Sequence, residues 1–319
     1  MSFVSLGEVL IQLNSVTPGP LRHTKYLEVH VAGAEANVMV GLSRLGLETG
    51  LVTKVGCDEF GNLIISTLRG ERVDISRVKV DPNAPTGLYF IQRHYPVPRK
   101  STVLYYRRGS AASKMSPEDV EADYLSRFNH LLLTGITPAL SPSCADAVSK
   151  SYEIAKRRGL EVIFDTNIRM KLWNSLEEAR KTISEYLQSK IVFTNEEDLN
   201  ILYPGSEMIS AAHRIAEKGA EIVVVKMGAK GALAIVGNRV FKKEAFQICQ
   251  VEDVIGAGDA FNAAFLASIL EGYSVEEALE NGNAAGALVV TVRGDIEALP
   301  TWNDLKTFIE STKKALLLR

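Results

Sequence analysis

The chain has 319 residues, of which 46% are hydrophobic and 23% charged, so it is long and apolar enough to bury a globular core. A formal net charge of −2, without a dense block of Lys and Arg, excludes the basic surface of a sequence-independent nucleic-acid binder. Three scattered cysteines exclude a disulfide framework and a CxxC metal site, and no run approaches the roughly 18 apolar residues of a membrane span. We therefore expect a cytoplasmic protein that binds small molecules and has no nucleic-acid or membrane partner.

Residues 32–61 combine a helix with turns that suit ligand contact. A helix is expected over 36–45, followed by a strand over 49–55. Gly33, before the helix, allows the backbone to approach a ligand closely, and the amide of Asn37 can hydrogen-bond to hydroxyl groups. Ordinary caps and turns explain each glycine of the stretch equally well when it is judged alone.

The segment 86–108 predicts a β ribbon. Two stretches rich in aromatic and β-branched residues flank the sequence YPVPRK, which is typical of two antiparallel strands joined by a proline-containing turn. Residues 25–33 can add another strand. We interpret 8–33 together with 86–108 as a small β lid within a single domain spanning 1–319, because no Gly/Ser/Pro-rich linker divides the chain.

The ribbon also predicts an oligomer. Leu88, Phe90 and Val103 are apolar ribbon residues that we expect to be exposed. Exposed apolar strands are covered by another subunit in many proteins, so we expect a homo-oligomer that pairs through the lid.

Apolar runs alternate with amphipathic helical patterns over most of the remaining chain. The strand-like runs are 130–136, 160–167, 190–195 and 220–228, and the helical patterns between them include 141–159 and 175–189. This alternation predicts an α/β fold with a mostly parallel sheet and helices on both faces. Ligands of such sheets gather at the carboxyl ends of the strands.

The stretch VEDVIGAGDAF, residues 251–261, predicts a Gly-Ala-Gly turn that opens a helix. Backbone amides at a helix start are unpaired and lie at the positive end of the helix dipole, so the turn can bind an anion such as phosphate. Asp259 beside it can accept the proton of an attacking hydroxyl group. For this stretch alone, an N-cap or first-turn acid is the simpler interpretation.

Together, the two glycine-containing stretches resemble the paired signatures of the PfkB, or ribokinase-like, family of carbohydrate kinases. The N-terminal signature fits at Gly33, Asn37, Leu45, Gly46, Gly56, Asp58 and Gly61, and the C-terminal signature fits at 253–259. One departure is Ile255, where the family usually has threonine. The resemblance covers essentially the whole chain and implies a three-layer α/β/α fold with a mostly parallel central sheet and a small β-strand lid.

The resemblance implies roles for the residues of these motifs. Asp259 is implied to be the catalytic base, and the amides of Gly256, Ala257 and Gly258 to stabilise the transferred phosphoryl group. ATP and Mg²⁺ are the implied cofactors. The residues implied to contact the nucleotide are Asn195, Lys226, Gly228, Gly231, Gly256, Gly258 and Ala285. The protein ligands of the metal stay open, since Asp198 stands where the family's Asn-x-x-Glu motif has glutamate.

The arginines of the chain suit an acceptor that carries a carboxylate, although lid arginines that are merely solvated are the alternative interpretation. Arg107, Arg108 and Arg169 supply guanidinium groups, whose fork suits a planar carboxylate, and Tyr89 and Tyr105 can lie against a sugar face.

Further stretches, among them GEVLIQLN, HVAGAEAN, YYRRGSA, DTNIR and VRGD, resemble archaeal 2-keto-3-deoxygluconate kinases. The resemblance implies transfer of the γ-phosphoryl group of ATP to the C6 hydroxyl, with 2-keto-3-deoxygalactonate as a second acceptor. The implied substrate contacts are Gly33, Asn37, Tyr89, Tyr105, Arg107, Arg169 and Asp295.

Three other functions are alternatives to this one. A fructokinase or another PfkB sugar kinase shares the Asp-x-Asn-x-Arg pattern at 165–169. A non-catalytic sugar-sensing protein belongs to a different class, and the intact Asp259 argues against it. An NAD-dependent dehydrogenase is disfavoured because the Gly-Ala-Gly turn lacks the third glycine of GxGxxG and lies late in the chain.

Overall fold

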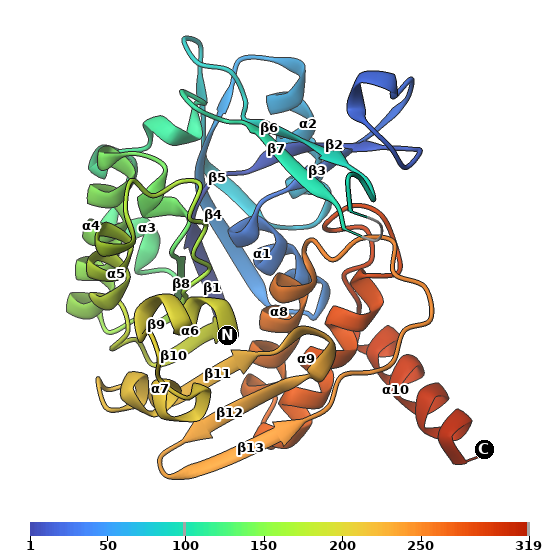
Figure 1. The fold of residues 1–319 in the computed structure, drawn as a ribbon. Coiled ribbons are helices and arrows are strands. Elements are labelled where there is room, and N and C mark those ends of the chain that lie inside the picture. Colours follow the sequence, from blue (N-terminus) through green and yellow to red (C-terminus); the bar gives the residue numbers. More distant parts are fainter. Residues whose placement is uncertain (98–99, 318–319) are drawn as a thin grey trace.

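A nine-stranded sheet forms the centre of the computed structural model, which describes residues 1–97 and 100–317 (Figure 1). The strand order is β13-β12-β11-β10-β9-β8-β1-β4-β5, and only β12 and β13 run antiparallel to their neighbours. The strands are β1 (Ser2–Leu6), β4 (Glu48–Gly56), β5 (Asp74–Asp81), β8 (His130–Thr134), β9 (Glu161–Asp165), β10 (Ile191–Asn195), β11 (Ile222–Lys226), β12 (Ala232–Val236) and β13 (Arg239–Lys243). The predicted mostly parallel sheet is thereby confirmed.

Helices cover both faces of this sheet, which confirms the predicted three layers (Figure 1). One face carries α3 (Ala122–Leu125), α4 (Pro142–Arg158), α5 (Leu176–Ser184), α6 (Glu196–Leu202) and α7 (Met208–Ala216). The other carries α1 (Ala34–Arg44), α2 (Glu59–Gly70), α8 (Ala257–Leu270), α9 (Val275–Val289) and α10 (Trp302–Leu317). Among the described residues, no helix combines the length and the apolar character needed to cross a bilayer.

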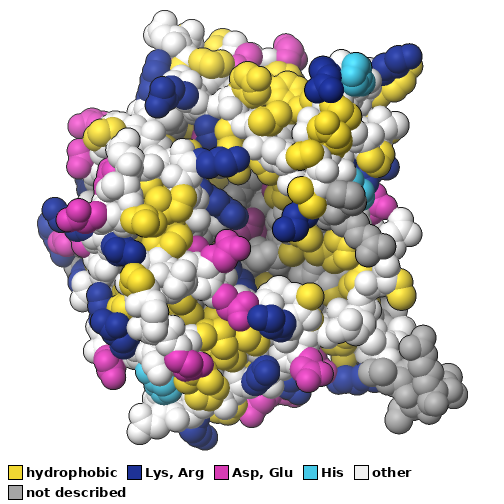
Figure 2. All heavy atoms as spheres, in the orientation of Figure 1, with side chains coloured by type: hydrophobic (Ala, Val, Ile, Leu, Met, Phe, Trp, Pro, Cys, Tyr) yellow, Lys and Arg dark blue, Asp and Glu magenta, His cyan; other side chains and the backbone are white. Residues whose placement is uncertain are grey.

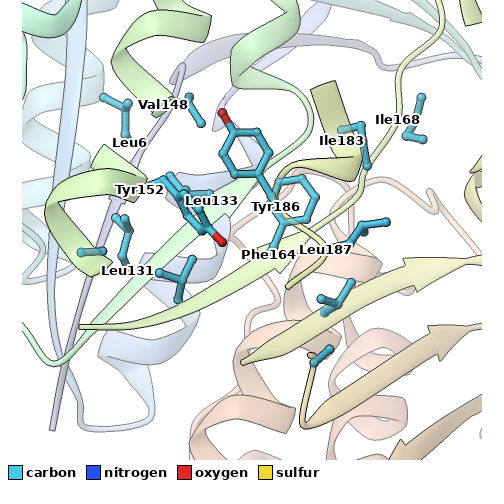
Figure 3. Packing of buried hydrophobic residues seen from close by; sticks show 14 of the residues in the cluster. Leu6, Leu131, Leu133, Val148, Tyr152, Phe164, Ile168, Ile183, Tyr186 and Leu187 are labelled. Carbon is cyan, nitrogen blue, oxygen red and sulfur yellow. The ribbon is translucent and has the colours of Figure 1, made fainter. Parts of the chain in front are cut away.

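The central strands are apolar on both faces because helices bury both. Leu131 and Leu133 of β8 point into the core beneath α4 and α5, which Figure 3 shows, whereas Leu132 between them belongs to the core beneath α8. Side chains of a strand alternate between its faces, so one continuous apolar run supplies both cores.

Local signals set the helix boundaries. The Ser141 hydroxyl accepts a hydrogen bond from the Cys144 amide at 3.1 Å, and Gly159, with φ of 76°, ends α4, as expected from its sequence. The helix expected over 175–189 ends earlier, at Ser184. It stops there because the chain then turns to bury Tyr186 and Leu187 in the core.

A second sheet has the order β3-β2-β6-β7, with strands β2 (Leu10–Ser15), β3 (Leu27–Ala32), β6 (Leu88–Gln92) and β7 (Thr102–Tyr106). We call it the lid sheet. β6 and β7 pair antiparallel, as predicted, and so do β2 and β3, whereas β2 and β6 are parallel. Pro98 and Arg99, in the predicted turn, lie outside the described residues.

The two faces of the lid sheet have different surroundings. Its outer face carries Leu13, Leu27, Val29, Leu88, Phe90, Leu104 and Tyr106. The inner face carries Leu10, Gln12, Tyr89, Val103 and Tyr105, most of which border a cavity. The expectation that Val103 is exposed on the ribbon is therefore wrong, because strand alternation turns it inward; Leu88 and Phe90 face outward but are half-buried.

Candidate active site

A cavity of about 360 Å³ lies between the lid sheet and the carboxyl ends of the central strands, and Figure 2 shows the hollow below the lid. Asp165, Asn195 and Lys226 end β9, β10 and β11, and all three border the cavity. The cavity also brings together every predicted substrate and base residue, namely Gly33, Asn37, Tyr89, Tyr105, Arg107, Arg169, Asp259 and Asp295.

The start of α8 is open to the cavity. Gly256, with φ of 78°, makes the turn that a side chain would strain, and a Cβ there would lie 3.1 Å from the Asp295 carbonyl oxygen. In the part of the chain that the structure describes, the amides of residues 257–259 donate to no acceptor. Asp259 lies in the first turn of α8, as the simpler interpretation allows, but its carboxylate does not cap the helix. The amides can therefore bind an anion.

One amide nitrogen joins two carboxylates in the cavity wall. Nδ2 of Asn37 donates to Oδ2 of Asp259 at 2.8 Å and to Oδ2 of Asp295 at 3.0 Å. Burial raises the pKa of each carboxyl group to about 7, against the opposing effect of the Asn37 hydrogen bond. A carboxylate with a pKa near neutrality is suited to accept a proton from a hydroxyl group at physiological pH.

The ammonium group of Lys226 acts on Asp259 and is itself held by two polar side chains. Nζ of Lys226 donates to Oδ2 of Asp165 at 2.7 Å and to Oδ1 of Asn262 at 3.1 Å. The second carboxylate oxygen of Asp165 is buried and has no partner among the described residues. This ion pair holds the ammonium group beside Gly258, where a phosphate at the helix start would lie.

The three arginines predicted to meet the acceptor differ in their surroundings. Nε of Arg107 donates to the buried carboxylate of Glu8 at 2.6 Å, so its charge is largely neutralised within the protein. The exposed Arg169 borders the cavity, and within the described residues its guanidinium group has no ion-pair partner. Arg108 is exposed and lies outside the cavity wall. Arg169 is thus the group most available to an incoming carboxylate.

Two tyrosine rings of the lid sheet border the first cavity beside Arg107. The ring centroids of Tyr89 and Tyr105 lie 5.6 Å apart, and the Arg107 guanidinium carbon lies 5.3 Å from the Tyr105 centroid. Tyr89 is buried, and burial raises its pKa well above the ordinary value of 10.0. Its hydroxyl group therefore stays protonated and donates to the Asp295 carboxylate at 3.4 Å.

A second cavity, of about 400 Å³, begins where the first one ends. Lys226, Gly228, Val254 and Gly258 border both. The second cavity is mainly apolar, with walls from residues 245–248 and one face of α9. Its shape and position suit the base of a nucleotide whose phosphates reach the start of α8.

Two of the predicted nucleotide residues differ in placement. Gly231 borders the second cavity, with φ of 99°, and a Cβ there would collide with the Lys243 carbonyl oxygen. Ala285 is fully buried in the core and does not border the cavity, so the structure corrects its assignment. Asn283, Gly286 and Ala287 form the face of α9 that borders the second cavity instead, because helical periodicity turns residue 285 away from them.

The side chains of Asn195 and Asp198 have different surroundings. Asn195 borders the first cavity and caps α6, accepting a hydrogen bond from the Asp198 amide at 2.8 Å. The buried Asp198 carboxylate accepts from the Thr166 hydroxyl at 2.6 Å and the Ile168 amide at 3.1 Å. Burial raises the pKa of Asp198. Asp198 therefore holds the loop after β9 instead of facing a ligand.

The sequence interpretation missed five polar residues in and behind the cavity wall, namely Glu8, Gln12, Glu35, Asp165 and Asn167. Glu8 had a signal, as a lone carboxylate within an apolar run. Asp165 and Asn167 stand at a strand end in the same short stretch as Arg169. Gln12 gave no signal, because its partner Asp295 is 283 residues away in the sequence.

Comparisons with known proteins agree with this geometry. Residues 2–302 match the family described as pfkB family carbohydrate kinase. A 2-dehydro-3-deoxygluconokinase of Thermoproteus tenax is 45% identical over 313 residues, which cover 98% of this chain and 95% of the relative. A Bacillus subtilis protein of the same name is 33% identical, covering 97% and 96%. A 5-dehydro-2-deoxygluconokinase of Bacillus licheniformis is 32% identical, covering 96% and 95%.

A solved structure shares the fold. The crystal structure of a putative ribokinase II from E. coli, in complex with ATP and Mg²⁺, has a TM-score of 0.90 and 29% sequence identity, covering 97% of this chain and 99% of the other. The ribokinase-like fold class expected from the sequence is thereby confirmed.

The raised pKa of Asp295 predicts how stability depends on pH. The ordinary pKa is 3.8 and the folded value is about 7, so the unfolded chain releases this proton first as the pH rises. The contribution of Asp295 is fully present below its unfolded pKa and is lost as the pH rises through 7. We expect the free energy of unfolding to fall between pH 5 and pH 8 by about 2 kcal/mol more in the wild type than in Asp295→Asn.

Chemical denaturation at both pH values measures this difference. Asp146→Asn, on the exposed surface of α4, is the control and keeps the wild-type pH dependence. Equal pH dependence of the wild type and Asp295→Asn would show that Asp295 is ionised at neutral pH without penalty.

Proposed function

This chain belongs to the pfkB family of carbohydrate kinases, and on that premise we propose that it transfers the γ-phosphoryl group of ATP to the C6 hydroxyl of 2-keto-3-deoxygluconate. The relative with 45% identity over nearly the whole chain is named for this sugar acid in its dehydro nomenclature. 2-Keto-3-deoxygalactonate carries the same functional groups and is proposed as a second acceptor. A fructokinase remains the rival within the family.

One observation carries the proposal. The Asp259 carboxylate and the open amides of residues 257–259 lie at the junction of two cavities, one polar and one mainly apolar. A phosphoryl group passing from the nucleotide to a hydroxyl group has to cross such a junction. A non-catalytic sugar sensor has no need of a base and an anion site that face the same point.

The residues at the junction have complementary roles. Asp259 accepts the proton of the acceptor hydroxyl as the hydroxyl oxygen bonds to the γ-phosphorus and the bond to the β-phosphate oxygen breaks. The amides of Gly256, Ala257 and Gly258 and the Lys226 ammonium group stabilise the charge of the phosphoryl group in transfer. The lid sheet excludes water, which would otherwise compete with the sugar as acceptor.

Orphan polar atoms support a polyhydroxylated acid as the acceptor. Both amide protons of Asn37 are used within the protein, and its Oδ1 is buried without a partner among the described residues. Such an oxygen needs a donor, which a substrate hydroxyl supplies. The Arg169 guanidinium group supplies the matching donors for a carboxylate.

We propose that Mg²⁺ accompanies the nucleotide. The described residues contain no group of three or more His, Cys, Asp or Glu side chains that could hold a metal ion. Mg²⁺ carried by phosphates and water needs only one or two protein carboxylates, and the unpartnered oxygen of Asp165 fits that requirement. When bound, the ion neutralises charge on the phosphates.

We also propose a cytoplasmic location and a homo-oligomer. The three free cysteines support a reducing compartment. The outer face of the lid sheet exposes Leu27, Val29, Leu104 and Tyr106, and Figure 2 shows hydrophobic side chains gathered over the lid. A contiguous apolar patch on a sheet is typical of an interface, and a second copy of the chain presents the same patch for isologous pairing.

Replacing the base tests the mechanism. Asp259→Asn keeps the size of the side chain and an acceptor for the Asn37 amide but cannot take a proton. We expect kcat to fall by about 10²- to 10⁴-fold, while calorimetry shows that ATP and sugar acid still bind. Asp146→Asn, on the exposed surface of α4, keeps the wild-type kcat. Near-native turnover of Asp259→Asn contradicts the assignment of the base.

Replacing Arg169 tests the class of acceptor. We expect Arg169→Gln to raise KM for 2-keto-3-deoxygluconate by about 10- to 100-fold and to leave KM for fructose unchanged, because only the acid loses an ionic partner. Arg108→Gln, three residues after Tyr105 but outside the cavity wall, is the control. Arg107 is less suitable, since its loss leaves the buried Glu8 unpaired. Fructose as the better wild-type substrate would favour the fructokinase alternative.

The oligomer is tested with a charge in the outer face of the lid. Val29 and Val80 are 48% and 50% exposed, and only Val29 lies on the lid sheet. We expect sedimentation to give a wild-type mass above that of one chain and Val29→Asp to reduce it to one chain. Val80→Asp on β5 keeps the wild-type mass. A monomeric wild type rules out the lid interface.

A further inference from the structure

Gln12 lies behind the cavity wall, yet its amide contacts two residues that form the wall. It stands on the inner face of β2 and is fully buried. Nε2 donates to Oδ1 of Asp295 at 2.6 Å and to the Tyr89 hydroxyl oxygen at 2.9 Å. Oε1 accepts from Nδ2 of Asn14 at 3.3 Å. A buried primary amide is stable only when its donors and acceptor are used in this way.

The contact continues to the base. Asp295 accepts from the Asn37 nitrogen that also donates to Asp259. A chain of hydrogen bonds therefore runs from strand β2 of the lid sheet, through the segment after α9 and the first turn of α1, to the first turn of α8. Gln12 is the only step of this chain on β2, and it touches no part of the first cavity.

We propose that Gln12 is a positioning residue for the reaction: its amide orients Asp295 and favours the ionised carboxylate there, and through Asn37 it fixes the carboxylate of Asp259. The inference rests on the proposed function, in which Asp259 takes the proton of the acceptor hydroxyl. It extends that function by making the lid sheet part of the apparatus that prepares the base.

The physical link is the repulsion between two buried carboxylates. An N–H donor stabilises the ionised form of Asp295, so loss of the Gln12 amide leaves the proton on Asp295 to a higher pH. A neutral Asp295 no longer opposes ionisation of Asp259, because the two groups titrate as a coupled pair. Removing Gln12 therefore lowers the pH at which Asp259 becomes a base, and it also frees the orientation of Asp295.

Other charged groups face the pair and stay in place when Gln12 is changed. Lys226, Arg169 and Asp165 act on Asp259. Asp253 and Glu297 act on Asp295, and the Tyr89 hydroxyl group on β6 donates to it at 3.4 Å.

The pH dependence of kcat/KM for the sugar acid, at saturating Mg-ATP, measures the link. We expect Gln12→Met, which keeps the length of the side chain without its amide, to move the acid limb to lower pH by about one unit and to lower kcat. Gln92→Met is the matched control. It removes the same amide from the neighbouring strand β6, where the side-chain hydrogen bonds of Gln92 among the described residues are with the Leu21 amide and the Tyr95 carbonyl group, and we expect it to keep the wild-type limb. If Gln12→Met only loosened the lid sheet, KM would rise and the acid limb of the pH profile would not move. That result would overturn the proposal.

A double-mutant cycle shows whether Gln12 acts through Asp295. We expect Asp295→Asn alone to move the limb in the same direction, and Gln12→Met to add no further shift in that background. Additive shifts overturn the proposal. An unmoved acid limb in Asp295→Asn also overturns it, and this result can be obtained even if Gln12→Met does not fold. Failure of the proposed function is a separate outcome, since Asp259→Asn would then retain its turnover whatever happens at Gln12.

Discussion

The close approach of α1 and α8 is the constraint on which the site depends. A Cβ at Gly41 would lie 2.7 Å from the Cβ of Ala263, so the two helices are as near to each other as glycine permits. Asn37 and Asp259 stand one helical turn before these contact residues, on the same faces. The packing therefore brings the Asn37 amide to 2.8 Å from the Asp259 carboxylate. The geometry of the base follows from an apolar contact deeper in the core.

The lid sheet supplies a second part of the wall of the first cavity, opposite the helices α1 and α8. Its inner face supplies Tyr89 and Tyr105 to the cavity and Gln12 to the hydrogen bonds behind it, whereas its outer face is apolar. Successive side chains of each strand lie on opposite faces of the lid sheet. A shift of one residue in register would therefore move the inner-face residues to the outer face and the outer-face residues to the cavity. The pairing of β2 with β6 thus fixes both the lid side of the first cavity and the surface proposed to meet a second subunit.

Sequence patterns sufficed for the parts of the fold and the site that depend on neighbours in the chain. The alternating runs predicted the order of strands and helices, and the residues around Gly256 predicted the turn and the open amides at the start of α8, because turns and helix starts are local. Gln12 was missed because its role comes from a contact with Asp295, 283 residues away. Ala285 and Val103 were misplaced for a different reason: a one-residue error in the assumed face turns a cavity residue into a core or surface residue.

The two departures from the family motifs have a common physical explanation. Ile255, where threonine is usual, packs against the small core of the lid sheet that contains Leu10 and Tyr89. Asp198, where glutamate is usual, holds the loop after β9 from both sides of Asn167, whose φ of 30° needs such support. Each of these two side chains packs against, or hydrogen-bonds to, a segment beside the first cavity. The proposed anion site uses the open backbone amides of residues 257–259 together with Lys226, so it needs no hydroxyl group at position 255.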